Sequence, residues 1–222
     1  IGKIGPGAEK AIEPLCNIFA NRSVQKRYRA AWAIGQIGPK ALPSLSERIS
    51  DSATAQRAGA IEALGWMIDS AKPASELLTP MLKDDSTTIR RLAVTSLGRL
   101  GPSGHPSLAV ALLDDDSQVK AIAVRALGQA DILTVPVLDS MTQLTRDEDP
   151  AVRAAALIAL GRGMNDAGRL LDLLLNGIQD PSPNVQGAAA HLLQDVDGQT
   201  EVALAALSEL LEHEQRPTRI AA

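Results

Sequence analysis

The 222-residue chain is poor in aromatic residues, which make up 2% of it, and it contains a single cysteine, Cys16. The low aromatic content argues against a β-sandwich or β-barrel, because strands draw on aromatic and β-branched residues. One cysteine excludes an internal disulfide framework and a zinc site built from several thiolates. No apolar run approaches the ~18 residues that a transmembrane helix needs. The net charge of -4 gives no general reason to bind nucleic acid.

An internal repeat dominates what the sequence does contain. A glycine follows an Ala- and Leu-rich segment at intervals of 30 or 33 residues, and Gln194 takes the next place. We call these the anchor positions: Gly2, Gly35, Gly65, Gly98, Gly128, Gly161 and Gln194. From Gly35 onward, alanine stands five residues before each anchor, and Ile or Leu stands one residue before it. This register over six units indicates a repeat protein.

Each repeat has the pattern of two helices. The second, helix B, carries the Ala/Leu segment, and in most repeats it follows a good N-cap such as Ser23 or Asp149, twelve residues before the anchor. The first, helix A, has apolar residues at helical spacing, as at Leu42, Leu45 and Ile49. A single helix pair cannot bury its apolar stripe alone, so neighbouring pairs must stack. The sequence therefore predicts an all-α fold, an α-solenoid (α-α superhelix) of helix pairs with a period of 30–33 residues.

The array is predicted to run over residues 1–222 as a single domain of six complete helix pairs with a partial repeat at each end. Residues 1–5 read as the end of a helix B, and a helix A at about 198–213 begins a seventh repeat. We therefore expect the chain to be a fragment of a longer protein. Uncapped apolar ends would favour end-to-end self-association.

A polar ladder recurs at the turn between helices A and B. An acidic residue or Asn stands fourteen residues before each anchor, and a basic residue stands six residues later in most repeats. We predict a structural ladder between successive repeats, comprising Asp51, Arg57, Asp84, Arg90, Asp114, Lys120, Asp147 and Arg153. Its two ends depart from the pattern, with Asn21 in place of the acid and Gln186 in place of the base, so the ladder should be weakest there.

These features resemble HEAT repeats, which place an aspartate in the A–B turn, an arginine six residues on, and a proline such as Pro43 or Pro106 eight residues before the aspartate. The segment Val152-Arg153…Ala155-Ala156…Ala159-Leu160-Gly161 is similar to the phycobilisome-lyase (PBS lyase) type of HEAT-like repeat. The resemblance covers essentially the whole chain. It implies an armadillo-type solenoid in which the Asp/Arg ladder joins repeats and helix B lines a concave face.

No catalytic residue, metal site or cofactor is predicted. His105 reads as a partly buried structural residue, and His213-Glu214 is a single pair, whereas the HEAT-like enzyme deoxyhypusine hydroxylase uses repeated His-Glu pairs. The acidic turns lack the alternating ligands, glycine and distal Glu of a calcium loop. Cys16 lies among apolar residues and reads as a buried, inert thiol. We therefore expect no enzymatic activity from this chain.

A candidate binding surface lies on helix B. Residues nine, five and one before the anchor should be buried, so those seven and three before it and one after it must point elsewhere. That second set holds both tryptophans, the tyrosine and four arginines. The predicted partner-binding groove comprises Tyr28, Trp32, Glu62, Trp66, Arg91, Thr95, Arg99, Arg125, Gln129, Ile158, Arg162 and His191. In the alternative, the tryptophans merely pack between neighbouring helices B.

The function predicted from these features is a protein–protein interaction scaffold that holds a protein or peptide, one with an acidic segment, in a concave groove. Trp, Tyr and Arg are the residues that dominate interface hot spots. Nucleic acid is a weaker candidate, since the acidic total opposes a phosphate backbone. The alternative is a substrate- or chromophore-holding module of a lyase-like enzyme, as the PBS lyase resemblance permits.

Overall fold

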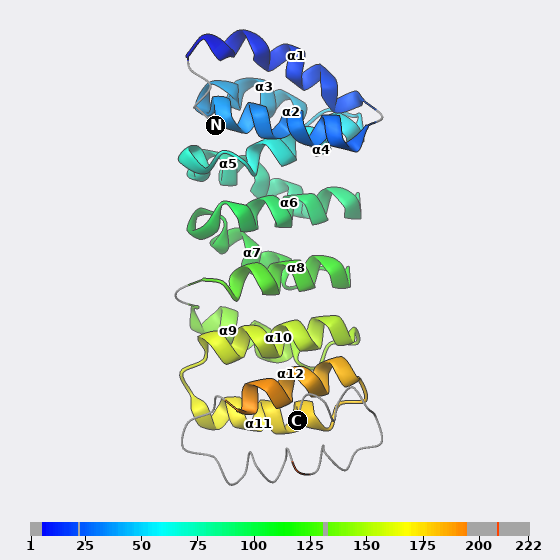
Figure 1. Ribbon diagram of the computed structural model, residues 1–222, viewed down its shortest axis with the longest axis vertical. Helices are drawn as coiled ribbons and strands as arrows, with labels where there is room; N and C mark the ends of the chain where they lie inside the picture. Colours follow the sequence, from blue (N-terminus) through cyan, green and yellow to red (C-terminus); the bar gives the residue numbers. More distant parts are fainter. Residues whose placement is uncertain (1–5, 22, 131–132, 195–207, 209–222) are drawn as a thin grey trace. The chain divides into compact units, whose positions relative to one another are not determined.

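The computed structural model describes residues 6–21, 23–130, 133–194 and 208 of the chain. All regular structure in these residues is helical (Figure 1). It comprises twelve α-helices and six short 3₁₀ segments. The prediction of an all-α solenoid is thereby confirmed. The partial repeats predicted at residues 1–5 and about 198–213 fall, apart from residue 208, outside the described residues.

The chain divides into two compact units, residues 1–126 and 127–222. In each unit, antiparallel pairs of helix A and helix B follow one another along the chain. A single array over residues 1–222 stays a prediction.

Unit 1 contains four helix pairs, and 3₁₀ segments extend each of its helices A. Its elements are η1 (Pro6–Ala11), α1 (Ile12–Cys16), η2 (Asn17–Ala20) and α2 (Val24–Ile37); η3 (Pro39–Ala41), α3 (Leu42–Arg48) and α4 (Thr54–Leu64); η4 (Ile68–Ser70), α5 (Ala71–Leu78), η5 (Thr79–Lys83) and α6 (Thr87–Arg99); and η6 (Gly101–Ser103), α7 (His105–Ala111) and α8 (Ser117–Leu127).

Proline is common in the helices A and absent from the helices B of unit 1. Pro43 and Pro106 lie in the first turns of α3 and α7, where a missing N–H costs nothing. Pro80 falls further along, after α5, and lies in the first turn of the 3₁₀ segment η5, where it cannot donate the next α-helical hydrogen bond. The helices B of unit 1 contain no proline and run uninterrupted.

Unit 2 contains two helix pairs within its described residues. These are α9 (Val135–Leu144) with α10 (Pro150–Gly163), and α11 (Ala167–Ile178) with α12 (Pro183–Leu193). Helix α10 packs on both α9 and α12, and α11 packs on α12. Pro150 and Pro183 occupy the first position of their helices, which they fit because their φ is already helical.

Small residues let the helices B pack closely on one another. In unit 1, α2 packs on α4 and α4 packs on α6. The repeated alanines are buried, including Ala30, Ala60 and Ala93. The anchor glycines sit where the next helix B crosses: a Cβ on Gly65 would lie 2.6 Å from Oγ of Ser96, and one on Gly98 would lie 3.0 Å from Cβ of Ala126. The anchor is therefore small because a neighbouring helix occupies the space of its side chain.

The expected burial of helix B holds at two of its three positions in every described repeat. Residues five and one before the anchor are buried from α2 to α12. The position nine before the anchor is buried in α6, α8, α10 and α12, but Lys26 is exposed there and Gln56 is half-buried. The prediction was wrong for Lys26, since an ammonium group without a partner remains in water rather than entering a core.

The ladder residues that precede helix B form its N-terminal turns. Oδ1 of each residue accepts a hydrogen bond from the backbone N–H two positions on, at 2.7–2.9 Å in all six described turns, from Asn21 to Asp180. The side chain therefore satisfies a donor that the helix itself leaves free.

The arginine six residues on joins two successive turns. Nη1 of Arg57, Arg90 and Arg153 donates to the backbone carbonyl of the ladder aspartate in its own repeat, at 2.9–3.1 Å. The same guanidinium then reaches the carboxylate of the next aspartate, in the pairs Arg57–Asp84 (3.3 Å), Arg90–Asp114 (2.8 Å) and Arg153–Asp180 (2.7 Å). These groups are largely buried in all three pairs.

Candidate protein-interaction surface

The predicted surface residues lie on or next to the helices B, and those of unit 1, such as α6 and α8, face the viewer in Figure 1. In unit 1, Tyr28 and Trp32 lie on α2, and Glu62 lies on α4 with Trp66 just beyond its end. Arg91, Thr95 and Arg99 follow on α6, and Arg125 on α8. Tyr28 and Arg125 are exposed, and the other six are half-buried.

Three of these side chains meet in one cluster, which we call the Trp66 cluster: Tyr28, Trp66 and Arg99. The Tyr28 ring meets the Trp66 ring edge-on, with 5.7 Å between centroids and an interplanar angle of 88°. The guanidinium carbon of Arg99 lies 4.6 Å from the centroid of the Trp66 ring, a cation–π distance. The cluster thus joins α2, the end of α4 and the end of α6 into one surface.

Backbone packing positions Trp66. Its backbone N–H donates to the carbonyl of Ala63 at 3.1 Å in the turn that ends α4. A Cβ on Gly35 of α2 would lie 2.4 Å from Cβ of Trp66, so the glycine leaves the space in which this residue sits. Nε1 of Trp66 is shielded from solvent and donates to no group that the structure describes. Close packing, rather than a hydrogen bond from the indole, therefore orients the ring.

Glu62 is the one carboxylate near this cluster that the helices B supply. It is half-buried, and burial raises the pKa of its carboxyl, while the positive charges of Arg99 and Arg27 lower it. Within the part of the chain that the structure describes, Glu62 and Arg99 form no ion pair.

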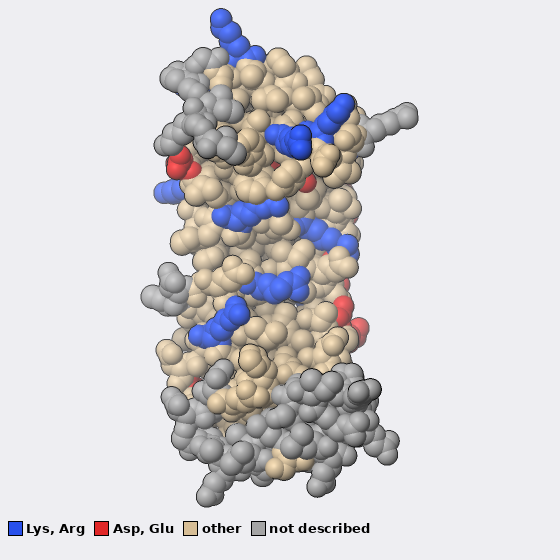
Figure 2. All heavy atoms as spheres, viewed as in Figure 1, with Lys and Arg blue, Asp and Glu red and all other residues tan. Residues whose placement is uncertain are grey.

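Charge is segregated between the two sets of helices. Glu62 is the only acidic residue within α2, α4, α6, α8, α10 and α12. Outside the ladder, the cations of these helices are Lys26, Arg29, Arg91, Arg99, Arg125 and Arg162. Figure 2 shows Lys and Arg predominating on the face where the helices B of unit 1 lie. The net charge of -4 gives no sign of this local excess of positive charge. The scarcity of acidic residues in helix B is visible in the sequence, and it would have pointed to Lys26 and Arg29 as further surface cations.

Two predicted surface residues are engaged within unit 1. Nε and Nη2 of Arg91 donate to the two carboxylate oxygens of Asp116 at 2.9 and 2.6 Å. The hydrogen bond from Arg91 lowers the pKa of Asp116 to about 2. The hydroxyl of Thr95 donates to the carbonyl of Arg91 at 2.8 Å. Arg91 is therefore less available to a partner than Arg99 or Arg125.

The remaining four predicted residues belong to unit 2. Gln129, Ile158, Arg162 and His191 are all exposed, and Ile158 keeps 40% of its surface accessible. Among the described residues, no ring contact or ion pair joins any two of these four side chains. The structure therefore brings the predicted aromatic and basic groups together in unit 1 only.

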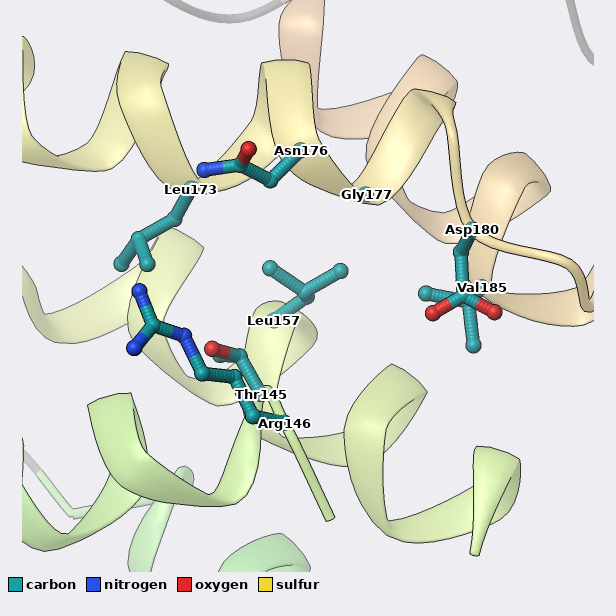
Figure 3. A pocket seen from close by; sticks show the side chains of 8 residues that line it. All are labelled: Thr145, Arg146, Leu157, Leu173, Asn176, Gly177, Asp180 and Val185. Atoms are coloured by element: carbon teal, nitrogen blue, oxygen red, sulfur yellow. The ribbon is translucent and has the colours of Figure 1, made fainter. Parts of the chain in front are cut away.

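Each unit has a hollow in its described residues that could be considered as a ligand site. In unit 2, a cavity of about 50 Å³ lies between α10, α11 and the turn after α9, and Figure 3 shows Arg146, Asn176 and Asp180 among its lining residues. That volume suits a few water molecules rather than an organic ligand. In unit 1, a shallow hollow of about 360 Å³ lies over the A–B turns beside Asp85 and Asp115.

Searches for other kinds of site found nothing in the part of the chain that the structure describes. No group of three or more His, Cys, Asp or Glu side chains is placed to hold a metal ion. No described helix is both long and apolar enough to cross a membrane. His105 is half-buried at the start of α7, Cys16 is fully buried, and His213 lies outside the described residues.

Solved structures share this fold. YibA of Escherichia coli superimposes with a TM-score of 0.68 at 19% identity, covering 98% of this chain and 81% of that one. An archaeal HEAT-like repeats protein from Thermococcus onnurineus gives 0.63 at 15% identity, over 95% and 93% of the two chains. The complex of CpcE and CpcF of phycocyanin lyase from a Nostoc species gives 0.58 at 25% identity, over 68% of this chain and 98% of that one.

A search of curated proteins finds no significant match. The family model of HEAT repeats matches residues 12–98 and 138–222, which is most of the chain and spans parts of both units. Helix pairs, ladder and neighbours agree with this match, and the chain belongs to the HEAT-repeat family.

Proposed function

We propose that this HEAT-repeat chain is a non-catalytic scaffold that binds an acidic segment of a protein partner across the helices B of unit 1. The observation that carries the proposal is the Trp66 cluster, an aromatic pair capped by Arg99 on a surface with several cations and one carboxylate. Repeat arrays of this kind offer extended surfaces along which a partner chain can lie. That the helices B line a concave groove is part of the proposal.

The residue types suit a partner with an apolar anchor followed by acidic side chains. Tyr28 exposes 43% of its surface, which is unusual for a ring that contacts another aromatic residue. Desolvated aromatic residues and arginines carry much of the energy of protein interfaces. Exposed cations such as Arg125 would chiefly steer an acidic partner toward the surface.

The test is titration calorimetry with short synthetic peptides in which Leu precedes several Asp residues. Peptides in which each Asp is replaced by Asn serve for comparison. The Asp peptides should bind with an affinity that falls as salt rises, and the Asn peptides should bind much more weakly. Trp66→Ala should cost ~2 kcal/mol or more of binding free energy. Arg99→Glu should weaken binding of the Asp peptides and change its salt dependence.

Leu113→Ala is the matched control, since Leu113 is 75% exposed but lies in an A–B turn. It should leave binding unchanged. If Trp66→Ala unfolds the protein while Arg99→Glu leaves peptide binding untouched, the cluster is core packing and the proposal fails. Equal or tighter binding of duplex DNA would favour nucleic acid instead.

A second candidate function is a substrate- or chromophore-holding module of a lyase-like enzyme. It is favoured by the likeness to the CpcE–CpcF complex of phycocyanin lyase, at 25% identity over 68% of this chain. Specific binding of a bilin in the absence of any protein partner, seen as a shift in its absorption spectrum, would support this candidate. No shift at bilin concentrations well above those of the protein would exclude it.

A further inference from the structure

Arg99 is held differently from the arginines of the ladder. Arg57, Arg90 and Arg153 each face a carboxylate of the next repeat. Arg99 instead lies 4.6 Å over the Trp66 ring, and no hydrogen bond or ion pair joins its guanidinium to any residue that the structure describes. Its N–H groups therefore have no acceptor among the described residues, while its guanidinium carbon lies over an aromatic ring.

This arrangement prepares a guanidinium to bind a carboxylate. A planar guanidinium stacked on a ring is restricted in rotation, and its N–H donors point outward in the plane of the group. Because Arg99 is half-buried, a carboxylate that reaches it meets fewer competing water molecules than it would at the exposed Arg125. Paired, charge-assisted N–H···O bonds are roughly twice as strong as neutral ones.

A second cation lies one helix away. A Cβ on Gly98 would lie 3.0 Å from Cβ of Ala126, so α6 and α8 touch at the chain neighbours of Arg99 and Arg125. Packed helices lie about 8–10 Å apart. An extended chain in the polyproline II conformation has three residues per turn and advances ~3.1 Å per residue, so residues three positions apart lie on one face, ~9 Å from each other. Two acidic residues three positions apart on an extended segment therefore match the separation of these helices.

We infer that Arg99 is the carboxylate receptor of the surface, binding an Asp or Glu side chain of an extended acidic segment while Arg125 attracts a second acid three residues away. The inference rests on the proposed function. Arg99 sets specificity through its fixed, two-pronged geometry, and Arg125 contributes charge. An apolar side chain of the partner segment makes contact with the rings of Trp66 and Tyr28.

The experiment uses the whole chain and a short peptide, blocked at both ends, that carries Leu and two Asp residues three positions apart. Each Asp is replaced in turn by Asn, and affinity is measured for the wild type, Arg99→Lys and Arg125→Lys. Both substitutions keep the positive charge, so electrostatic steering is matched between them. Thermal unfolding of each variant is followed by circular dichroism.

Arg99→Lys should weaken binding of the two-Asp peptide about tenfold or more, because an ammonium group cannot reproduce the paired hydrogen bonds. Arg125→Lys should weaken it less than about threefold. The loss from Arg99→Lys should disappear with one of the two Asn peptides, which identifies the Asp that Arg99 binds. Unfolding temperatures of the two variants should match.

If the peptide binds but both variants weaken it equally, the proposed function stands and the role of Arg99 is overturned. If Arg99→Lys lowers the unfolding temperature and leaves affinity unchanged, the stack on Trp66 is structural and the inference is wrong. If no acidic peptide binds the wild type, the proposed function and the inference fail together.

Discussion

Arg90 holds both carboxylate oxygens of Asp114, with Nε 2.8 Å from Oδ2 and Nη2 3.1 Å from Oδ1. The hydrogen bond that Arg90 donates to this carboxylate is the chief reason that the pKa of Arg90 is raised. The pair connects α6 to the turn before α8, and both side chains are largely buried. The ladder therefore contributes fixed, partly desolvated contacts between repeats rather than loose surface ion pairs.

We expect Arg90→Ala and Asp84→Ala each to lower the free energy of unfolding by ~1–3 kcal/mol, as loss of one partner from a buried polar network does. Urea unfolding followed by circular dichroism measures this. Arg169→Ala is the control, because Arg169 and Asp139 form a pair in which both side chains are about half exposed. It should cost at most about 1 kcal/mol. Ladder variants as stable as the wild type would refute a structural role.

Gly35→Ala should destabilise the protein by ~1–3 kcal/mol through overpacking, because the new Cβ would collide with Cβ of Trp66 and its backbone. Gly168→Ala provides the contrast, since Gly168 is an exposed helical residue whose nearest neighbouring atom would lie 3.6 Å from the new Cβ. That change should be neutral or stabilise by up to about 1 kcal/mol. Thermal unfolding distinguishes the two, and equal effects would contradict the close approach at Gly35.

Stability should depend on pH through Asp116. Its pKa is lowered to about 2 in the folded protein, below the ordinary value of 3.8. The resulting stabilisation is fully present above about pH 4 and is lost as the pH falls toward 2. The difference in unfolding free energy between the wild type and Asp116→Asn should therefore be largest near pH 7 and shrink across that range. With Asp115→Asn, a change at the exposed neighbour, we expect a smaller difference at pH 7. A gap for Asp116→Asn that is constant down to pH 2 would contradict the assignment.

Cys16 should resist alkylation while the protein is folded. Its side chain is fully buried, and burial raises the pKa of its thiol to about 11. Iodoacetamide at pH 8 should therefore modify native protein far more slowly than protein unfolded in urea, since only the thiolate reacts. Mass spectrometry follows the reaction. Equal rates in both conditions would show that the first helix pair opens readily.

The sequence predicted the fold well because the repeat places equivalent residues in equivalent contacts. Alanine at positions such as Ala93 and the aspartate at Asp114 recur with one spacing, so each repeat supports the interpretation of the others. Helix starts were predictable too, and Ser23 and Asp149 accept hydrogen bonds as N-caps. Lys26 broke the burial pattern because the pattern gives a position and not the charge of its occupant.

The candidate surface was predictable only as a set of helical positions. The sequence places Tyr28 seven residues before its anchor, and Trp66 and Arg99 one residue after theirs. The contacts among these three side chains depend on how closely their helices approach. The pairing of Arg91 with Asp116 depends on the same spacing. Contacts between side chains of different repeats are set by tertiary packing, which no single-repeat pattern encodes.

The double role of the ladder arginine has a consequence for how such chains lengthen. The repeat of Asp84 and Arg90 brings one guanidinium, which reaches forward to Asp114, and one carboxylate, which Arg57 reaches from the repeat before it. Duplicating or deleting a whole repeat keeps the two kinds of group in equal number, whereas a cut within a repeat separates an arginine from its acid. Recombination at the period of the repeat therefore leaves no buried arginine or aspartate without its partner. The length of an array can change in this way while the contacts between repeats stay the same.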